Sequence, residues 1–149
     1  MDLKTKDFYS KKLITVSQWE TPLNGLKIMK NHYIRHLPVI DDKTGTILGI
    51  VSDRDLLAEQ TNTEVTVRDI MCKDVLAFEL ETPLKKIVDE MIDKKVSSFL
   101  IKKHGQFTGI ITSEDMLHVL SMVLGDQEDP MLLNLIPFLQ FKYPATLVV

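Results

Sequence analysis

The chain has 149 residues, of which 44% are hydrophobic and 26% are charged, the balance of a globular protein with a buried core. Its formal net charge of −3, from 18 basic and 21 acidic residues, excludes the broad basic surface that binding to duplex nucleic acid requires. Cys72 is the single cysteine, which excludes an intramolecular disulfide framework and a cysteine zinc cluster, so we expect a cytoplasmic protein.

The first half of the chain predicts alternating strands and helices. Thr21 and Pro22 mark a helix start, because proline at the first helical position has no N–H to leave unpaired and threonine is a suitable N-cap. Apolar residues then recur at helical spacing, and two apolar strands follow around a turn that contains Gly45. The expected elements are, in order, a strand at 13–16, a helix from residue 22, strands at 37–40 and 46–51, and a helix after Ser52.

The second half predicts the same order of elements again. Three landmarks return: Thr-Pro-Leu at 21–23 and 82–84, the segments 34–39 and 96–101, and the segments 49–57 and 109–117. We therefore expect an α/β (α+β) fold in which two β-α-β-β-α repeats pack through their sheets with pseudo-twofold symmetry, because one unit of about 50 residues buries too little surface. The expected boundaries are 1–59 for the first repeat with its lead-in, 60–66 for a polar linker, 67–125 for the second repeat and 126–149 for an apolar tail.

The end of the first repeat resembles a known family. HLPVIDDKTGTILGIVSDRDLL, residues 36–57, is similar to the signature of the CBS (cystathionine-β-synthase) domain, and VRDIM, residues 67–71, resembles its common lead-in. The resemblance covers residues 8–124 and implies a tandem CBS pair, or Bateman module. Such pairs commonly dimerise into a flat disc and bind AMP, ADP, ATP or S-adenosylmethionine in clefts between the repeats. The resemblance therefore implies a regulatory adenosyl ligand and no catalytic cofactor.

Each repeat has a Ser/Thr-x-x-Asp element where its last strand enters its last helix: Ser52 with Asp55, and Thr112 with Asp115. A helix start offers backbone N–H groups to a phosphate, and the hydroxyl adds a further polar group. The carboxylate can accept both hydroxyls of a ribose, which is the role that the resemblance implies for these aspartates. The same pattern is also a helix capping box that needs no ligand. Both interpretations stay open for each repeat.

Two further features have paired interpretations. Gly49 and Gly109 precede apolar residues, and the missing side chain lets either a flat base or a packed segment approach the backbone. Trp19 lies between the first strand and the first helix, where it caps a ligand cleft or covers the edge of the core. For Trp19 we favour the core.

The two repeats differ in charge at aligned positions. The first has Arg35, His36 and Arg54, where the second has Ser97, Ser98 and Glu114. A phosphate prefers the cationic set, because guanidinium offers bidentate donors whereas glutamate repels it. The alternative is that these cations lie in solvent without a ligand. We predict a first site formed by Val16, Arg35, His36, Ser52, Arg54 and Asp55, which binds in preference to a second at Thr112 and Asp115.

Nothing in the chain indicates catalysis. The four histidines have no metal-ligand spacing, Cys72 is interpreted as a structural thiol, and no phosphate-loop or nucleophile-elbow pattern occurs. No apolar stretch approaches the roughly 20 residues of a membrane helix, and the N-terminus does not resemble a secretory signal. The apolar run 131–139 instead predicts a contact of the tail with its own sheet or, as we favour, with a second copy in a homodimer.

The expected function is a regulatory module that binds an adenosyl ligand and passes a shape change to an unidentified partner protein. Neither duplex nucleic acid nor a membrane is an expected partner. The alternative is a ligand-free dimerisation scaffold whose Ser/Thr-x-x-Asp elements only cap helices.

Overall fold

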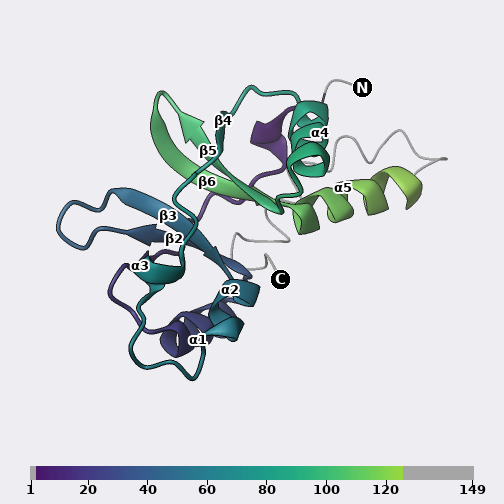
Figure 1. Cartoon of the computed structure of the whole chain (residues 1–149). Helices are drawn as coiled ribbons and strands as arrows, with labels where there is room; N and C mark the ends of the chain where they lie inside the picture. Colours follow the sequence, from purple (N-terminus) through teal and green to yellow (C-terminus); the bar gives the residue numbers. More distant parts are fainter. Residues whose placement is uncertain (1–2, 126–149) are drawn as a thin grey trace. The chain divides into compact units, whose positions relative to one another are not determined.

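The computed structural model describes residues 3–125 and divides them into two compact units (Figure 1). One unit comprises residues 13–75, and the other comprises residues 3–12 together with residues 76–125. Each unit contains one three-stranded sheet and its own helices. The predicted mixed α/β fold with two repeats is therefore confirmed.

The first unit follows the predicted order of strand, helix, strand, strand and helix. Its elements are β1 (Val16–Ser17), α1 (Pro22–His32), β2 (His36–Ile40), β3 (Ile47–Ser52), α2 (Asp53–Ala58) and α3 (Val67–Ile70). Strand β1 runs parallel to β2, which runs antiparallel to β3. Every element contributes an apolar side chain to one core: Val16, Met29, Leu37, Val39, Val51, Leu56 and Val67.

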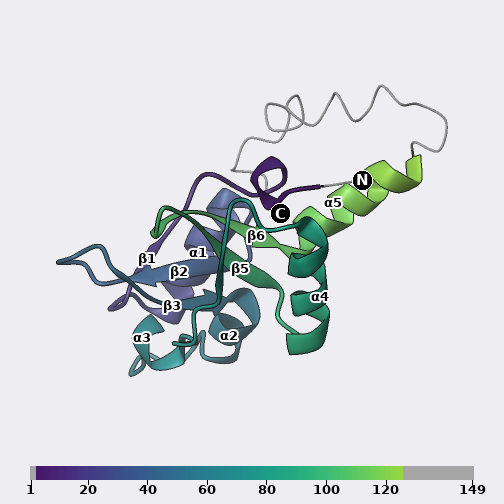
Figure 2. The ribbon, with the colours of Figure 1, turned by 90° about the horizontal axis from the view of Figure 1, so that it is seen from above.

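The second unit repeats this arrangement. Its elements are the short 3-10 helix η1 (Thr5–Asp7), β4 (Ala77–Glu79), α4 (Leu84–Lys94), β5 (Ser98–Lys103), β6 (Gln106–Thr112) and α5 (Ser113–Gly125). In both views α4 and α5 lie next to each other (Figures 1 and 2). Apolar residues at helical spacing on α4 pack against alternate residues of β5 and against β6. The buried members of this core are Leu84, Ile87, Met91, Phe99, Ile101 and Ile111.

The strand register shows how closely the two units correspond. Val39 of β2 lies opposite Gly49, and Ile101 of β5 lies opposite Gly109. In each unit the antiparallel register shifts directly after that pair, between Val39 and Ile40 and between Ile101 and Lys102. A register shift at the same place in both sheets is a repeated β-bulge, and bulges are structural features rather than accidents of folding.

Each sheet is bordered by a segment from outside its own sequence repeat. We call residues 3–10 the N-terminal lead-in and residues 66–72 the second lead-in. Ser10 exchanges two backbone hydrogen bonds with Ile110 of β6, at 2.8 and 3.0 Å, and Cys72 exchanges two with Ile50 of β3, at 2.9 and 3.0 Å. The N-terminal lead-in therefore packs on the second repeat, and the second lead-in packs on the first.

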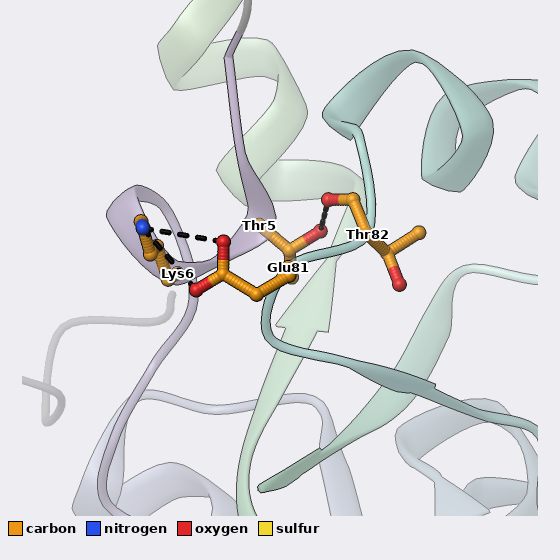
Figure 3. Close-up of polar contacts among 4 residues, drawn as sticks. All are labelled: Thr5, Lys6, Glu81 and Thr82. Carbon is orange, nitrogen blue, oxygen red and sulfur yellow. Dashed lines mark hydrogen bonds and ion pairs between the residues drawn. The ribbon is translucent and has the colours of Figure 1, made fainter.

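The N-terminal lead-in is fixed by a buried threonine and an ion pair (Figure 3). The backbone N–H and the hydroxyl of Thr5 both donate to the carbonyl oxygen of Thr82, at 3.0 and 2.7 Å. The Lys6 ammonium lies 3.2 Å from both carboxylate oxygens of Glu81. The buried Thr5 contacts hold the lead-in, because an exposed ion pair adds little free energy.

The second lead-in docks in the same way. Val67 donates its N–H to the carbonyl oxygen of Glu20 at 2.9 Å, and Arg68 donates its N–H to that of Gln18 at 3.0 Å. The Arg68 side chain also donates to Oε1 of the buried Gln18 at 2.9 Å, and its guanidinium carbon lies 5.2 Å from the centroid of the Trp19 ring. A cation of each lead-in thus contacts the second residue after the first strand of the sheet that it borders, Arg68 at Trp19 and Lys6 at Glu81.

These contacts place two segments in other units than the sequence prediction did. The sequence prediction grouped the N-terminal lead-in with the first repeat and residues 67–75 with the second, whereas the structure packs each with the other repeat. The reason is that the sheet edges at Ile50 and Ile110 pair with the lead-ins that dock there. The boundaries of the sequence repeats themselves stay predictions, and the tail at 126–149 lies outside the described residues.

The N-terminal lead-in also changes how α4 begins. Helix α1 starts as predicted, with Pro22 at its first position and the Thr21 side chain accepting the N–H of Asn24 at 3.2 Å. In α4 the expected start at Pro83 is wrong, because the helix begins at Leu84 with Pro83 as its N-cap. The Leu84 N–H donates to the Leu3 carbonyl at 2.9 Å, so the lead-in supplies the acceptor.

Candidate functional site

The first candidate corner lies where β3 ends and α2 begins. Ser52 is the N-cap of α2, and its N–H and hydroxyl both donate to Oδ2 of Asp55, at 2.9 and 2.7 Å. The Asp55 N–H donates in turn to the Ser52 hydroxyl oxygen at 3.3 Å. The capping box is therefore complete without a ligand, while Asp55 is exposed and its Oδ1 makes no hydrogen bond within residues 3–125.

The helix start does not offer the backbone donors that the sequence led us to expect. The Asp53 N–H donates to the Arg35 carbonyl at 2.9 Å, the Arg54 N–H to Oδ1 of Asp53 at 2.8 Å, and the Asp55 N–H to Ser52. The expectation of free N–H groups for a phosphate is therefore wrong at this corner, because side chains and a neighbouring carbonyl already occupy them. Any anion bound here must be held by side chains.

Three residues with basic side chains lie at the first corner. Arg35 precedes β2 and is exposed, and the adjacent His36 is half-buried and pairs with Ser52 in the sheet register. Arg54 is exposed in the first turn of α2, and its guanidinium makes no ion pair or hydrogen bond in the described part of the chain. The structure thus brings Arg35, His36, Ser52, Arg54 and Asp55 to one corner. Val16 lies in the core at 2% exposure, so its side chain is not at the surface of this corner.

The second corner, at the junction of β6 and α5, has the same hydrogen bonds in a more buried setting. The Thr112 N–H and hydroxyl donate to Oδ2 of Asp115 at 2.7 and 3.0 Å, and Ser113 donates its N–H to the Ser97 carbonyl at 2.9 Å. Thr112 is only 1% exposed. Burial raises the pKa of Asp115 to about 6, against the opposing effect of the two hydrogen bonds from Thr112.

A third Ser/Thr-x-x-Asp element outside either corner has the same two contacts to its carboxylate, although the Asp69 N–H donates to the Thr66 carbonyl and not to the hydroxyl. Thr66 caps α3, and its N–H and hydroxyl donate to Oδ2 of Asp69 at 2.8 and 2.9 Å. These two hydrogen bonds lower the pKa of Asp69. Sequence reasoning missed this box, although the pattern Thr-x-x-Asp is readable at 66–69. The Ser/Thr-x-x-Asp pattern alone therefore identifies a helix cap and does not identify a ligand site.

The two glycines serve packing rather than an approaching base. A Cβ on Gly49 would lie 2.6 Å from the Cys72 carbonyl oxygen and 2.7 Å from the Met71 sulfur, and a Cβ on Gly109 would overlap the Ser10 carbonyl oxygen and the Tyr9 ring. The space that the missing side chain leaves is filled by the lead-in of each sheet. The interpretation of these positions as contacts for a flat base is therefore wrong.

Trp19 is not a core residue. Its side chain is 59% exposed, with the Arg68 guanidinium over the ring. The sequence interpretation that it covers the core is wrong, because Trp19 is not among the side chains that pack on the first core. Cys72 is exposed as well, and its contribution to the fold is the backbone pairing with Ile50.

Within residues 3–125 no group of three or more His, Cys, Asp or Glu side chains is placed to hold a metal ion. No helix in that part of the chain is long and apolar enough to cross a lipid bilayer.

Comparison with known proteins agrees with the repeated fold. The sequence profile of the CBS domain matches residues 6–62 and again residues 67–122. The chain belongs to the CBS-domain family. The resemblance of residues 36–57 to the CBS signature is thereby confirmed, and the second match confirms that the CBS unit occurs twice.

Solved CBS structures are similar over most of the chain. A Vibrio cholerae protein assigned to acetoin utilization (AcuB) is 28% identical with a TM-score of 0.75, covering 87% of this chain and 99% of its own. The CBS domain pair of protein MJ0100, in complex with 5′-methylthioadenosine and S-adenosyl-L-methionine, is 25% identical with a TM-score of 0.73, covering 81% of this chain and 98% of its own.

A curated relative places CBS domains in a longer protein. The L-aspartate semialdehyde sulfurtransferase of Methanocaldococcus jannaschii is 28% identical over 112 residues, which are 74% of this chain but 22% of that protein. This chain spans 22 to 63% of the length of the first three curated relatives. The match to the CBS units does not carry the catalytic activity of the longer enzyme to this chain.

Proposed function

We propose that this CBS protein is a regulatory module that binds an adenosyl ligand at the first corner and passes the resulting shape change to a partner protein. The observation that carries the proposal is the state of the Asp55 carboxylate. Its Oδ2 holds the helix cap, while the exposed Oδ1 has no hydrogen bond within residues 3–125 and remains available to ribose hydroxyls.

The solved CBS pair of MJ0100 supports the ligand class. Its two bound molecules, 5′-methylthioadenosine and S-adenosyl-L-methionine, share an adenosyl group. Adenine nucleotides share the same group, so AMP, ADP and ATP belong to the class that we propose. The regulatory effect would follow from higher affinity of the ligand for one conformation of the protein than for another.

The capping boxes favour a second candidate function. In all three the carboxylate is hydrogen-bonded to the cap residue without a ligand, as expected for a scaffold whose Ser/Thr-x-x-Asp elements only stabilise helices. This alternative retains the fold and predicts no response to adenosyl compounds.

A thermal-shift screen separates the two functions. The purified chain is heated with AMP, ADP, ATP, S-adenosylmethionine or 5′-methylthioadenosine, and the shift that each ligand causes is compared between the wild type, Asp55→Ala and Asp115→Ala. A ligand at a hundredfold excess over its Kd adds about 2.7 kcal/mol of stability, which such an experiment resolves. We expect Asp55→Ala to remove the ligand-dependent shift.

Asp69→Ala is the matched control. It removes the aspartate of the Thr-x-x-Asp element that caps α3 and leaves both corners intact. Losing a cap lowers stability by about 1 kcal/mol with or without ligand, so the readout is the ligand-dependent shift and not the melting temperature itself. No shift with any ligand in the wild type would favour the scaffold. A shift that Asp55→Ala leaves unchanged would remove the ligand from the first corner.

We propose further that the protein acts without catalysis, as a homodimer in the cytoplasm. Its target is a partner protein that it regulates. The exposed apolar side chains of α5 support the dimer: Leu117, Leu120 and Leu124 are 64, 49 and 65% exposed.

A further inference from the structure

We infer that the exposed ring of Trp19 and the guanidinium of Arg68 form a docking surface for an acidic peptide segment of the regulated partner. The inference rests on the proposed function and adds to it the chemistry of that partner. The docking surface lies at the other end of the first sheet from the first corner. Strand β2 begins opposite Ser52 and ends opposite Ser17, two residues before Trp19.

The second repeat shows that the fold does not need an aromatic ring at this place. Arg68 and Lys6 each donate their N–H, at 3.0 Å, to the carbonyl of the residue directly after the first strand of the sheet. The next residue is Trp19 in the first unit and Glu81 in the second, where Glu81 forms an ion pair with Lys6. The first repeat replaces this pair by a ring that is 59% exposed, with an arginine over it. Tryptophan and arginine are the residue types that contribute most to the affinity of protein interfaces.

A buried glutamine orients the arginine of the docking surface. Gln18 is 3% exposed; its Oε1 accepts from the Arg68 guanidinium at 2.9 Å and its Nε2 donates to Oδ2 of Asp41 at 3.2 Å. The second repeat has Leu80 at this position, and Leu80 packs on the second core. A buried amide costs free energy that a leucine does not. The first repeat thus retains a polar side chain that fixes the direction of the guanidinium.

A guanidinium with a fixed direction suits a planar acceptor. Apart from the hydrogen bond to Gln18, the Arg68 guanidinium makes no hydrogen bond or ion pair within residues 3–125. Its other N–H groups can donate to both oxygens of a carboxylate, and the open side of the Trp19 ring can pack against an apolar or aromatic side chain. A basic segment would be repelled by Arg68. The chemistry therefore favours a glutamate or aspartate next to an apolar residue.

Two carboxylates near the docking surface oppose such a segment and provide a test of its charge. Backbone N–H groups of its own turn donate to Asp41 and lower the pKa of this residue, so it stays ionised. Asp69 is exposed and follows Arg68 directly. Asp69→Asn should therefore tighten the binding of an acidic segment on the order of two- to threefold at low salt. The same variant would weaken the binding of a basic segment.

Selection from a random peptide library displayed on phage tests the inference, with the full chain as bait and Arg68→Met for counter-selection. We expect the enriched peptides to share an acidic residue beside an apolar or aromatic one. The strongest peptide is then synthesised without tryptophan, together with a copy that has an amide in place of the acid. Trp19 is the single tryptophan of the chain, so a saturable change in its fluorescence reports binding at this surface.

Arg68→Met and the amide copy of the peptide should each weaken binding about tenfold, because each removes charge-assisted hydrogen bonds. Arg68→Lys should restore only part of the affinity, since it returns the charge without the planar donors. Lys6→Met is the matched control, because it removes the cation at the equivalent place of the second repeat, and it should bind the peptide as the wild type does. Amide exchange of Val67 and Cys72 checks that the second lead-in stays docked in Arg68→Met through its backbone hydrogen bonds.

The outcomes separate the docking surface from the proposed function. Selection of no shared sequence, selection of basic peptides, or an acidic peptide that binds Arg68→Met as tightly as the wild type would overturn the docking surface. None of these results affects the adenosyl screen. Peptide binding by a chain that responds to no adenosyl compound would instead overturn the ligand-sensing function and leave the docking surface in place.

Discussion

Asp55 and Asp115 show that one local pattern produces different chemistry in different surroundings. Both accept a backbone N–H and a hydroxyl at the start of a helix. Asp55 is exposed, whereas Asp115 is partly buried behind a threonine that solvent hardly reaches. A carboxyl group that is removed from water binds its proton more tightly, so burial raises the pKa of Asp115, whereas Asp55 is an exposed acceptor.

The raised pKa of Asp115 predicts a pH dependence of stability. With a folded pKa of about 6 against an ordinary value of 3.8, the folded protein binds more protons at this site than the unfolded chain between roughly pH 4 and pH 6. Its contribution to the free energy of unfolding is therefore full below pH 4 and is lost as the pH rises through 6. Asp115→Asn cannot titrate, so the stability difference between wild type and variant should fall by about 2 to 3 kcal/mol across this window.

Urea unfolding at pH 4, 5, 6 and 7 measures this difference. Asp93→Asn, at an exposed position on α4 of the same unit, controls for the general loss of one carboxyl group. A stability difference for Asp115→Asn that does not vary with pH would show that burial does not perturb this carboxyl.

At the scale of elements, the docking of each lead-in depends on a glycine in the sheet that it borders. The backbone of each one passes over a glycine, Gly49 or Gly109, and pairs with the next residue of the same strand. The glycine is required for space and not for an unusual backbone angle. Neither position has a positive φ, in contrast to the turn residues Gly45 and Gly105.

Gly109→Ala should therefore undock the N-terminal lead-in. The new methyl group would overlap the Ser10 carbonyl and the Tyr9 ring, and relieving such an overlap costs about 1 to 3 kcal/mol. We expect the free energy of unfolding to fall by that amount, and amide exchange of Ser10 and Ile110 to accelerate. Gly125→Ala is the control, since a Cβ there meets nothing within 4 Å. Equal free energies of unfolding for the two variants would mean that the lead-in can move away from the new methyl group without loss of stability.

Local patterns predicted most of the elements because their causes are local. The Thr21-Pro22 start, the helical spacing on α4 and the turns at Gly45 and Gly105 depend on residues a few positions apart. The docking of the lead-ins could not be predicted in this way, since Thr5 meets Thr82 far along the chain. One signal for this docking was present in the sequence: Thr5-Lys6-Asp7 aligns with Val67-Arg68-Asp69, which indicates that the two lead-ins are repeats of each other.

The site was predictable only in part. The residues of the first corner were identified from the sequence, and the structure brings them together except for the buried side chain of Val16. The occupied N–H groups of α2 could not be foreseen, because they depend on the Arg35 carbonyl and on the rotamer of Asp53. The Ser/Thr-x-x-Asp pattern cannot distinguish a cap from a ligand contact, as Asp69 shows.

At the scale of the whole molecule, α5 predicts self-association. Leu117, Leu120 and Leu124 recur at helical spacing on one face, and no residue of α5 is buried. Burial of such a face against a second copy is favourable by about 25 cal/mol per Å² of apolar surface. In sedimentation velocity the full chain should be a dimer, and Leu120→Asp should be a monomer.

Gln106→Asp adds the same charge at the exposed start of β6, at the opposite end of that strand from α5, and should remain a dimer. A monomeric wild type, or a dimer that Leu120→Asp leaves intact, would contradict an interface through this face. Repeating the wild-type measurement without residues 126–149 tests whether the tail takes part in the contact.

The exchange of lead-ins also sets an order of events during synthesis. The second lead-in meets a sheet whose strands, at residues 16–52, have already been made, so the first unit can be completed once Cys72 has left the ribosome. The N-terminal lead-in must wait for Ile110, and at roughly 5 to 20 residues per second that wait is about 5 to 20 seconds. Throughout it Phe8 and Tyr9 lack the second core on which they later pack. Phe8 and Tyr9 are therefore covered long after they are made, and chaperones would meet these apolar side chains before the sheet that covers them exists.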